Sequence, residues 1–320
     1  MIKAIILFLI ALVLLIKGGD WFVDGSVNIA KRLKVPEILI GATVVSIGTT
    51  LPEVMVSATS AASGHGQIAY GNAIGSIICN TALIAAITLS VRPSPADKKA
   101  LKLPVVFFFS AAVIFAAAAY FFGFLGRIFG SLMLLIFAAY IVLSTRLALG
   151  ESRQDNQETE PQKGSVLSDI IWLIIGAALI AVGADLLVDN GTLLARYIGV
   201  PEAVIGLTFV ALGTSLPELV TAITALTKGH GALSLGNIVG ANLFNIVLVT
   251  GVSTTVSPFA IPKESTISGV ASSLIVDIPV MFAVMLILTL PGLLKGKLYR
   301  TQGILLLAIY IAFCIFQFVL

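Results

Sequence analysis

The sequence predicts an all-α membrane protein with ten transmembrane helices in two inverted five-helix repeats, in which helices 2 and 7 are broken. Three observations predict this fold: an apolar composition, apolar segments of membrane-spanning length, and an internal repeat at a constant offset. Hydrophobic residues make up 58% of the 320 positions and charged residues 11%, with a mean hydropathy of +1.08. Soluble proteins carry roughly 25% charged residues. We therefore expect a multi-pass protein of the cell membrane, surrounded by the lipid bilayer and with no evident nucleic-acid or protein partner.

Ten apolar segments are long enough to cross a bilayer as helices, which takes about 20 residues. A membrane β-barrel would instead show alternating segments of about 10 residues. No small-residue cleavage site follows the first segment, so we expect it to be retained rather than removed as a signal peptide. The expected spans are residues 2–24, 36–62, 68–90, 103–122, 127–147, 166–190, 201–227, 232–256, 268–290 and 302–320.

The positions of lysine and arginine predict the orientation of these spans. With ten spans and an N-terminus outside the cell, most basic residues face the cytoplasm, as the positive-inside rule requires, and the C-terminus also lies outside. Lys3, Arg127, Arg196 and Lys263 would remain outside. The residues placed in the cytoplasm are Lys31, Arg32, Lys34, Arg92, Lys98, Lys99, Lys102, Arg146, Arg153, Lys163, Lys228, Lys295, Lys297 and Arg300.

An internal repeat relates the two halves of the chain. Glu53 and Glu218 are 218 − 53 = 165 positions apart. Each half holds five spans, an odd number, so the second half enters the membrane in the opposite orientation. Such inverted repeats are typical of secondary transporters, which bind substrate near the middle of the membrane where the halves meet. The same offset, without a gap, pairs Asp20 with Asp185, Asp24 with Asp189, Pro36 with Pro201, Gly41 with Gly206, Asn72 with Asn237 and Asn80 with Asn245.

The repeat also predicts the domain organisation. We expect residues 1–147 to form the first five-helix repeat and residues 166–320 the second, inverted one. Residues 148–165 would form a cytoplasmic linker. Most of it reads ESRQDNQETEPQKGS, which is polar and charged and gives no sign of a folded regulatory domain.

The motif GTTLPE at residues 48–53, repeated as GTSLPE at 213–218, puts a proline and a glutamate in the middle of an apolar segment. Pro52 cannot donate to the carbonyl of Gly48, so we expect a broken helix there. Freed carbonyls survive in a membrane only beside protein or a polar cavity, and a bound cation would satisfy them. A kinked helix with a structural glutamate is the simpler explanation for one copy, but two copies in inverted register favour a cation site.

The expected ligands of this site are all oxygen atoms. Hard cations such as Ca²⁺ and Na⁺ prefer oxygen, whereas copper and zinc favour His or Cys. One divalent cation or two monovalent cations would neutralise two buried carboxylates. The site could therefore exchange one divalent cation for two monovalent cations. Besides backbone carbonyls, the ligands are the carboxylates of Glu53 and Glu218 and the hydroxyls of Thr49, Thr50, Thr214 and Ser215.

A second motif follows each copy of the first: GNAIGSIICN at 71–80 and GNIVGANLFN at 236–245. Residues four apart share one face of a helix, which aligns Asn72, Ser76 and Asn80 in the first copy. The corresponding face of the second copy carries Asn237, Ala241 and Asn245. The asparagines could bind Na⁺ or hydrogen-bond a neighbouring helix, and the glycines would let helices approach closely.

Four acidic residues, Asp20, Asp24, Asp185 and Asp189, are expected near the ends of the first and sixth spans. They could cap the helices at the membrane interface or attract cations to the entrances.

The paired motifs GATVVSIGTTLPE and GLTFVALGTSLPE, each followed by GNxxG, resemble the α-repeats of the sodium/calcium exchanger family, within the cation/Ca²⁺ exchanger superfamily. The resemblance covers nearly the whole chain and is to prokaryotic members. It implies that the first and sixth helices slide against the others to alternate access. It also implies electrogenic antiport of Na⁺ against Ca²⁺, without a cofactor and without enzymatic activity.

The resemblance also implies individual metal ligands. Glu53 and Glu218 match the central carboxylates for both ions, and Thr49 and Thr214 match ligands through carbonyl and hydroxyl. The remaining matched positions are the hydroxyls of Thr50 and Ser215, the backbone carbonyls of Ser46 and Ala211, and the side chains of Ser76, Asn80 and Asn245.

This chain departs from the family pattern at several positions. Ala241 stands where the pattern usually has Ser, which leaves the number of Na⁺ ions open. Asn245 replaces the Asp of potassium-dependent members, so we do not expect K⁺ to be co-transported. Proton/calcium antiporters usually carry GNxxE, where this chain has Gly75 and Gly240.

The first hypothesis is therefore a Na⁺/Ca²⁺ antiporter that works by alternating access at a shared midplane site. The alternative is an H⁺/Ca²⁺ (or Mn²⁺) antiporter that uses the same glutamates. A membrane-embedded hydrolase is a third possibility, but the chain contains no GxGD or HExxH motif and no nucleophile–base pair.

Overall fold

The computed structural model describes all residues except 94, 155–164, 200–212, 264–265, 268 and 320. The described chain is almost entirely helical, and nine of its helical segments are long and apolar enough to cross a membrane. The seventh expected span, 201–227, is represented by the shorter apolar helix α10 (Leu216–Thr227), because its first half lies outside the described residues.

The first half of the chain forms the following elements: α1 (Ile2–Leu33), α2 (Glu37–Ile40), η1 (Gly41–Val45), α3 (Ser46–Ala62), α4 (Gly66–Cys79), η2 (Asn80–Ala85), α5 (Ala86–Val91), α6 (Lys98–Ala117), η3 (Ala118–Phe122), β1 (Phe124–Leu125) and α7 (Arg127–Gln154). The η segments are π-helical turns that continue an α-helix. Helix α7 extends seven residues beyond residue 147, so helix replaces part of the expected linker.

The second half forms α8 (Val166–Tyr197), α10, α11 (Gly231–Phe244), η5 (Asn245–Val249), α12 (Thr250–Val256), β2 (Phe259–Ala260), β3 (Thr266–Ile267), β4 (Val270–Ala271), η6 (Ser273–Asp277), α13 (Ile278–Lys295) and α14 (Arg300–Val319). Strand β1 pairs with β2, and β3 pairs with β4, both antiparallel. The first of these two-residue ladders ties the loop after η3 to the loop after α12.

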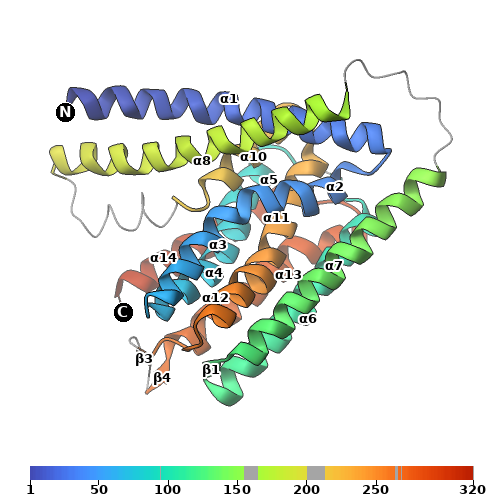
Figure 1. Ribbon diagram of the computed structural model, residues 1–320. Helices are drawn as coiled ribbons and strands as arrows, with labels where there is room; N and C mark the ends of the chain where they lie inside the picture. The colour runs from blue at the N-terminus through green and yellow to red at the C-terminus, as the bar shows by residue number, and fades with distance from the viewer. Residues whose placement is uncertain (94, 155–164, 200–212, 264–265, 268, 320) are drawn as a thin grey trace.

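Helices α1 and α8 show that the two halves are inverted. They lie side by side and run in opposite directions (Figure 1). A Cβ at Gly18 would lie 2.9 Å from the carbonyl oxygen of Gly176, and one at Gly183 would lie 3.2 Å from that of Ala11. The offset relates Gly18 to Gly183 (18 + 165) and Ala11 to Gly176 (11 + 165). Exchanging the two repeats therefore turns one of these contacts into the other. Two equivalent helices packed antiparallel have opposite orientations.

Both helices are longer than a single crossing needs. Each has 32 residues, or about 48 Å at 1.5 Å per residue, against a hydrocarbon core of about 30 Å. The expected end of the first span at residue 24 is therefore wrong: α1 continues to Leu33. It stops there because Lys34 adopts a left-handed conformation (φ 53°) and Pro36 follows, a combination that ends helices.

The second span is interrupted, but not where the proline predicts. The π-helical turn η1 precedes α3, and α3 remains helical across Pro52. Side chains satisfy the carbonyls of this turn: Ser46 Oγ donates to Gly41 O at 2.8 Å, and Tyr140 OH donates to Ala42 O at 2.8 Å. These donors stabilise the irregular backbone one turn before the position that the sequence predicts.

The same segment packs closely against α11 of the other repeat. An added Cβ at Gly236 would lie 2.2 Å from Ile38 O, and one at Gly240 would lie 2.3 Å from Ser46 Oγ and 2.6 Å from Ala42 Cα. These two glycines therefore allow the close approach that the GNxxG motif predicts.

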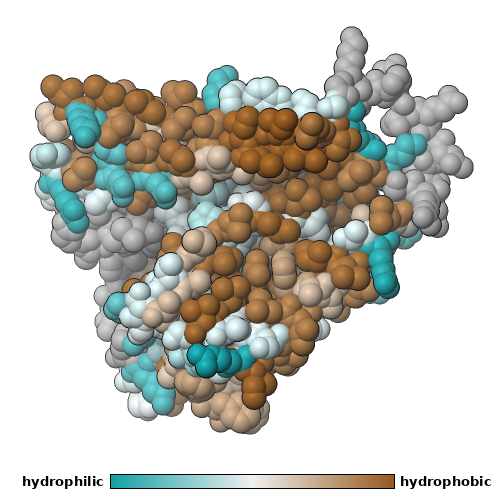
Figure 2. Space-filling model, viewed as in Figure 1, coloured by the Kyte–Doolittle hydropathy of each residue, from teal (hydrophilic) through white to brown (hydrophobic). Residues whose placement is uncertain are grey.

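The outside of the helices is apolar. Figure 2 shows hydrophobic side chains over much of the visible face, and large examples such as Phe121 and Ile128 are 83% and 89% exposed. A soluble monomer rarely exposes such continuous apolar surface, whereas a lipid bilayer covers it.

Candidate functional site

The two glutamates of the repeated motif meet in the interior. Glu53 lies within α3, and Glu218 lies in the first turn of α10. Both side chains are 0% exposed, and the two carboxyl groups are neighbours in the interior. Among the described residues, none of their four carboxylate oxygens has a hydrogen-bond partner.

The hydroxyls of the first motif lie beside the glutamate of the second motif. Thr49 and Thr50 lie beside the carboxylate of Glu218, and no hydrogen bond joins them to it. Ser215 lies beside Cys79 at the end of α4 and is 2% exposed. The site is therefore built across the interface between the repeats, and not within either one.

Asn80 and Asn245 occupy equivalent positions in this arrangement. Each is the first residue of a π-helical turn, η2 and η5, and each is 0% exposed. Turn η2 packs against α10 and η5 packs against α3, so the turn that begins with each asparagine contacts the motif helix of the other repeat. Within the described chain, the nitrogen and the oxygen of both amides are without hydrogen-bond partners. Such π-helical turns occur frequently at functional sites.

The asparagines of the GN pairs bind the motif threonines in a crossed pattern. Thr49 Oγ1 donates to Asn237 Oδ1 at 3.2 Å, and Thr214 Oγ1 donates to Asn72 Oδ1 at 3.2 Å. These asparagines therefore hydrogen-bond across the repeats, which is one of the two roles left open for them by the sequence.

The remaining expected ligands have varied surroundings. The hydroxyl of Ser46 is directed at the carbonyls of Gly41 and Asn237, at 2.8 and 3.0 Å, so it supports the π-helical turn. Ser76 is 5% exposed and lines a cavity together with Thr214. Ala211 lies outside the described residues.

A cavity of about 700 Å³ leads to one side of the motifs. Residues of α3 and α8, with Thr214 and Pro217, line it, and Asp185 and Asp189 of α8 are at its wall. Helix α8 and helix α3 are thus separated by a space that reaches the motif segments of both repeats.

The equivalent interface between α1 and α10 is packed. A Cβ at Gly19 would lie 2.8 Å from Thr224 Oγ1. Lys228 Nζ lies 2.9 Å from an oxygen of Asp24 and 3.2 Å from one of Asp20. The expectation that Asp20 and Asp24 lie near a helix end is wrong, because α1 extends beyond them, and both pair with Lys228. The two routes to the site are therefore different in this structure.

The structure contains a buried polar cluster near the site that the sequence did not predict. Asn242 Nδ2 donates to Thr81 Oγ1 at 2.6 Å and contacts Met285 Sδ at 3.1 Å. The offset of 165 pairs Asn242 with Ile77 and Thr81 with Ile246, so the cluster has no counterpart in the repeat that could have marked it.

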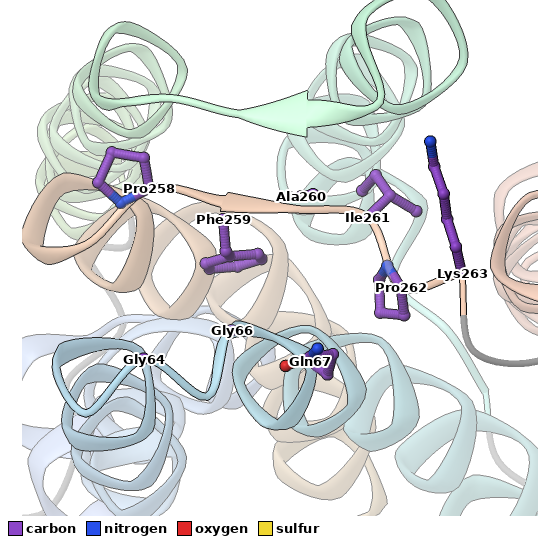
Figure 3. A pocket seen from close by; sticks show the side chains of 9 residues that line it. All are labelled: Gly64, Gly66, Gln67, Pro258, Phe259, Ala260, Ile261, Pro262 and Lys263. Atoms are coloured by element: carbon purple, nitrogen blue, oxygen red, sulfur yellow. The ribbon is translucent and has the colours of Figure 1, made fainter.

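A separate cavity of about 580 Å³ lies at the loops after α3 and α12 (Figure 3). The ring of Phe259 points toward the loop between Gly64 and Gly66, and a Cβ at Gly66 would lie 2.2 Å from Phe259 Cβ. Its described lining contains none of the expected ligands, so it is peripheral to the glutamates.

The chemistry of the central groups fits a hard cation. Within the described ranges, no three His, Cys, Asp or Glu side chains gather in one place. Two carboxylates and neutral hydroxyl and amide oxygens remain, which are the donors that alkali and alkaline-earth cations prefer. A charge in the middle of a membrane costs at least about 2.5–3.5 kcal/mol, so a cation between the glutamates would offset a large penalty.

Inverted repeats, interrupted helices and buried oxygen atoms at the repeat interface are the features of a membrane transporter for cations. The chain matches the sodium/calcium exchanger protein family over residues 3–146 and 168–319. It belongs to the sodium/calcium exchanger family, and its activity is cation/Ca²⁺ exchange.

Individual relatives cover nearly the whole chain. The putative antiporter CaxA of Alkalimonas amylolytica is 35% identical and the sodium/calcium exchanger MaX1 of Methanosarcina acetivorans is 31% identical, each over 98% of both chains. A structure of the sodium–calcium exchanger NCX_Mj soaked with Na⁺ and Sr²⁺ is 34% identical, covers 97% of both chains and has a TM-score of 0.81. The predicted fold class, an all-α membrane protein of two inverted five-helix repeats, is confirmed.

Proposed function

We propose that this chain exchanges Na⁺ for Ca²⁺ and that both ions compete for one site between Glu53 and Glu218. The observation that carries the proposal is the pair of fully buried carboxylates whose oxygens have no hydrogen-bond partner among the described residues. Buried polar groups are normally paired, and a cation bound between the two carboxylates would provide the missing partner for both. The sodium/calcium exchanger MaX1 adds support as a relative over 98% of both chains.

The charge of the site explains why the two ions exclude each other. One Ca²⁺ neutralises both carboxylates, and so do two Na⁺. Binding both loads together would leave excess positive charge in a low-dielectric interior, where each unpaired charge is expensive. The proposed ligands are Glu53, Glu218, Thr49, Thr214, Thr50, Ser215, Ser46, Ala211, Ser76, Asn80 and Asn245.

Alternating access would follow from the difference between the two routes. Helix α8 leaves a cavity beside α3, whereas α1 is packed on α10. A sliding movement of α1 and α8 against the other helices would open the packed α1–α10 interface and close the cavity between α8 and α3. The two interfaces can exchange states in this way because the repeat relates them. In the proposed orientation both termini lie outside and residues 148–165 are cytoplasmic, so the open cavity faces outward.

Proton coupling is the competing function, because glutamates can carry protons. Gly75 and Gly240 stand where proton/calcium antiporters usually have a glutamate, which favours Na⁺. The test is ⁴⁵Ca²⁺ uptake into proteoliposomes loaded with Na⁺, compared with vesicles loaded with choline and carrying only a pH gradient. We expect uptake to require internal Na⁺. Uptake driven by the pH gradient and indifferent to Na⁺ would identify a proton antiporter instead.

A control separates exchange from leakage. Vesicles that contain the Glu53→Gln, Glu218→Gln double variant should take up no Ca²⁺ under either gradient. Uptake by this variant equal to that of the parent chain would refute the shared site.

A further inference from the structure

We infer that Asn72 and Asn237 are positioning residues that hold the hydroxyl protons of Thr214 and Thr49 away from the cation, and that only the first is fully locked in place. The inference rests on the proposed cation site but not on the identity of the counter-ion. It assigns this chain a difference between its two repeats that lies outside the ligand set.

A threonine hydroxyl can bind a cation only through its oxygen lone pairs. It carries one proton, and a proton directed into the site would repel the cation. Thr49 donates its proton to Asn237 Oδ1, and Thr214 donates to Asn72 Oδ1, each at 3.2 Å. Both lone pairs of each threonine are therefore free for a cation. The asparagine keeps the threonine proton out of the cation site only while the asparagine oxygen, and not its nitrogen, faces the hydroxyl.

In the first repeat, the amide orientation of Asn72 is fixed. Its Nδ2 donates to Ser57 Oγ at 2.8 Å and to the backbone oxygen of Glu53 at 3.2 Å. Rotating the amide by 180° would lose the hydrogen bond to the Glu53 carbonyl and place Oδ1 against that oxygen, so that two acceptors would face each other. Ser57 is 0% exposed, so water does not replace it. The oxygen of Asn72 must face Thr214.

In the second repeat, the corresponding lock is missing. The offset places Ala222 at the position of Ser57, since 57 + 165 = 222. Asn237 is 0% exposed, and its Nδ2 has no hydrogen-bond partner in the described part of the chain. The flipped amide would donate to Thr49 Oγ1 and would also face Ser46 Oγ, which lies 3.4 Å from Oδ1 in the present orientation. In the flipped orientation the Thr49 proton can no longer go to Asn237, and the Glu218 carboxylate beside it lies inside the cation site.

The two threonines therefore differ as cation ligands. Thr214 is held permanently as an acceptor, whereas Thr49 is an acceptor only in one orientation of Asn237. Substituting Ala222→Ser would supply the missing hydroxyl, and Ser57→Ala would remove the existing one. The two changes form a matched pair, because each adds or deletes one oxygen atom at the same position of the repeat.

The test is the Kd for Ca²⁺ of the purified full chain in detergent, measured by calorimetry without Na⁺. We expect Ala222→Ser to tighten binding and Ser57→Ala to weaken it, each by about 2- to 10-fold, the range of one hydrogen bond. In an Asn237→Ala background, Ala222→Ser should have no effect on the Kd. In an Asn72→Ala background, Ser57→Ala should likewise have none. Thermal unfolding without Ca²⁺ checks that each variant folds.

A merely structural role would give a different pattern. If Ala222→Ser changes the Kd by the same factor with and without Asn237, the serine acts elsewhere and the inference is wrong. An unchanged Kd in both single variants, with normal unfolding, also overturns it. If Ca²⁺ binds as expected but uptake does not depend on Na⁺, the proposed function fails while this inference stands.

Discussion

The carboxyl groups of Glu53 and Glu218, 165 positions apart in the sequence, are both completely buried and are neighbours in the interior. The hydroxyls near Glu218 come from Thr49 and Thr50 of the opposite repeat. Neither repeat can therefore assemble this cluster of buried polar groups alone, because the hydroxyls beside Glu218 belong to the first repeat.

Neutralising either glutamate is expected to abolish Ca²⁺ exchange. Glu53→Gln and Glu218→Gln keep the shape of the side chain but remove the charge that a divalent cation needs. Loss of one partner in a buried charged contact costs about 2–5 kcal/mol, so Ca²⁺ affinity should fall by about 30-fold or more. Binding and ⁴⁵Ca²⁺ uptake measure the effect, and the yield of inserted protein is the control. Full exchange by both variants would remove these residues from the site.

Replacing the asparagines of the π-helical turns should affect stability and binding in opposite directions. Removing a buried polar group that has no partner need not destabilise a protein, so Asn80→Leu and Asn245→Leu should leave the ion-free Tm unchanged or raised. The same changes should weaken Ca²⁺ binding by about 10- to 100-fold, because hydrogen-bond or ligand contacts to charged groups contribute about 1.5–3 kcal/mol. Thermal unfolding with and without Ca²⁺ measures both effects. A large fall in the ion-free Tm would show instead that the amides are structural.

The contact of α11 with the second span makes Gly240 intolerant of a side chain. A Cβ there would lie 2.3 Å from Ser46 Oγ and 2.6 Å from Ala42 Cα, and the second contact is to backbone that cannot move aside. Overpacking of this kind costs about 1–3 kcal/mol. Gly240→Ala should lower the Tm, and Gly240→Val should lower it further. Equal Tm values for the three proteins would contradict the packing described for η1 and α11.

The ion pair of Lys228 with Asp20 and Asp24 should help to hold α1 against α10. Lys228→Met removes both contacts, and we expect a cysteine placed at Thr224 to react faster with a membrane-impermeant maleimide added from the linker side. The charge-conserving Lys228→Arg is the matched control, and the chain without the added cysteine gives the background. The same labelling rate for Met and Arg would show that the ion pair does not hold the interface closed.

The charge of this pair also predicts its pH range. Partial burial lowers the pKa of Lys228, but hydrogen bonds and charges from Asp24 and Asp20 outweigh that effect and raise the pKa above its usual value of 10.5. Stability from a raised lysine pKa is fully present below the unfolded value and is lost as the pH rises through the folded one. Because the thiol itself becomes more reactive as the pH rises, the informative quantity is the ratio of the labelling rate of Lys228→Met to that of the chain with Lys228. This ratio should stay constant across neutral pH and fall toward one only in strong alkali.

The sequence by itself determined the class of fold and the identity of the central carboxylates. A constant offset of 165 and five apolar spans per half force the second repeat to be inverted, because an odd number of crossings reverses direction. The paired GT[ST]LPE motifs then place a glutamate of each half at the same depth. These conclusions depend only on counting and on the cost of charge in hydrocarbon, so they needed no coordinates.

The tertiary structure alone decided which groups face one another. It placed the Thr49 hydroxyl on Asn237 of the other repeat, and it moved the interruption of the second span from Pro52 to η1. It also distinguished the packed α1–α10 interface from the open α3–α8 interface. Hydrogen bonds and contacts between repeats depend on helix rotation and tilt, which the packing of both halves sets together, whereas the repeat makes the two halves look alike in sequence.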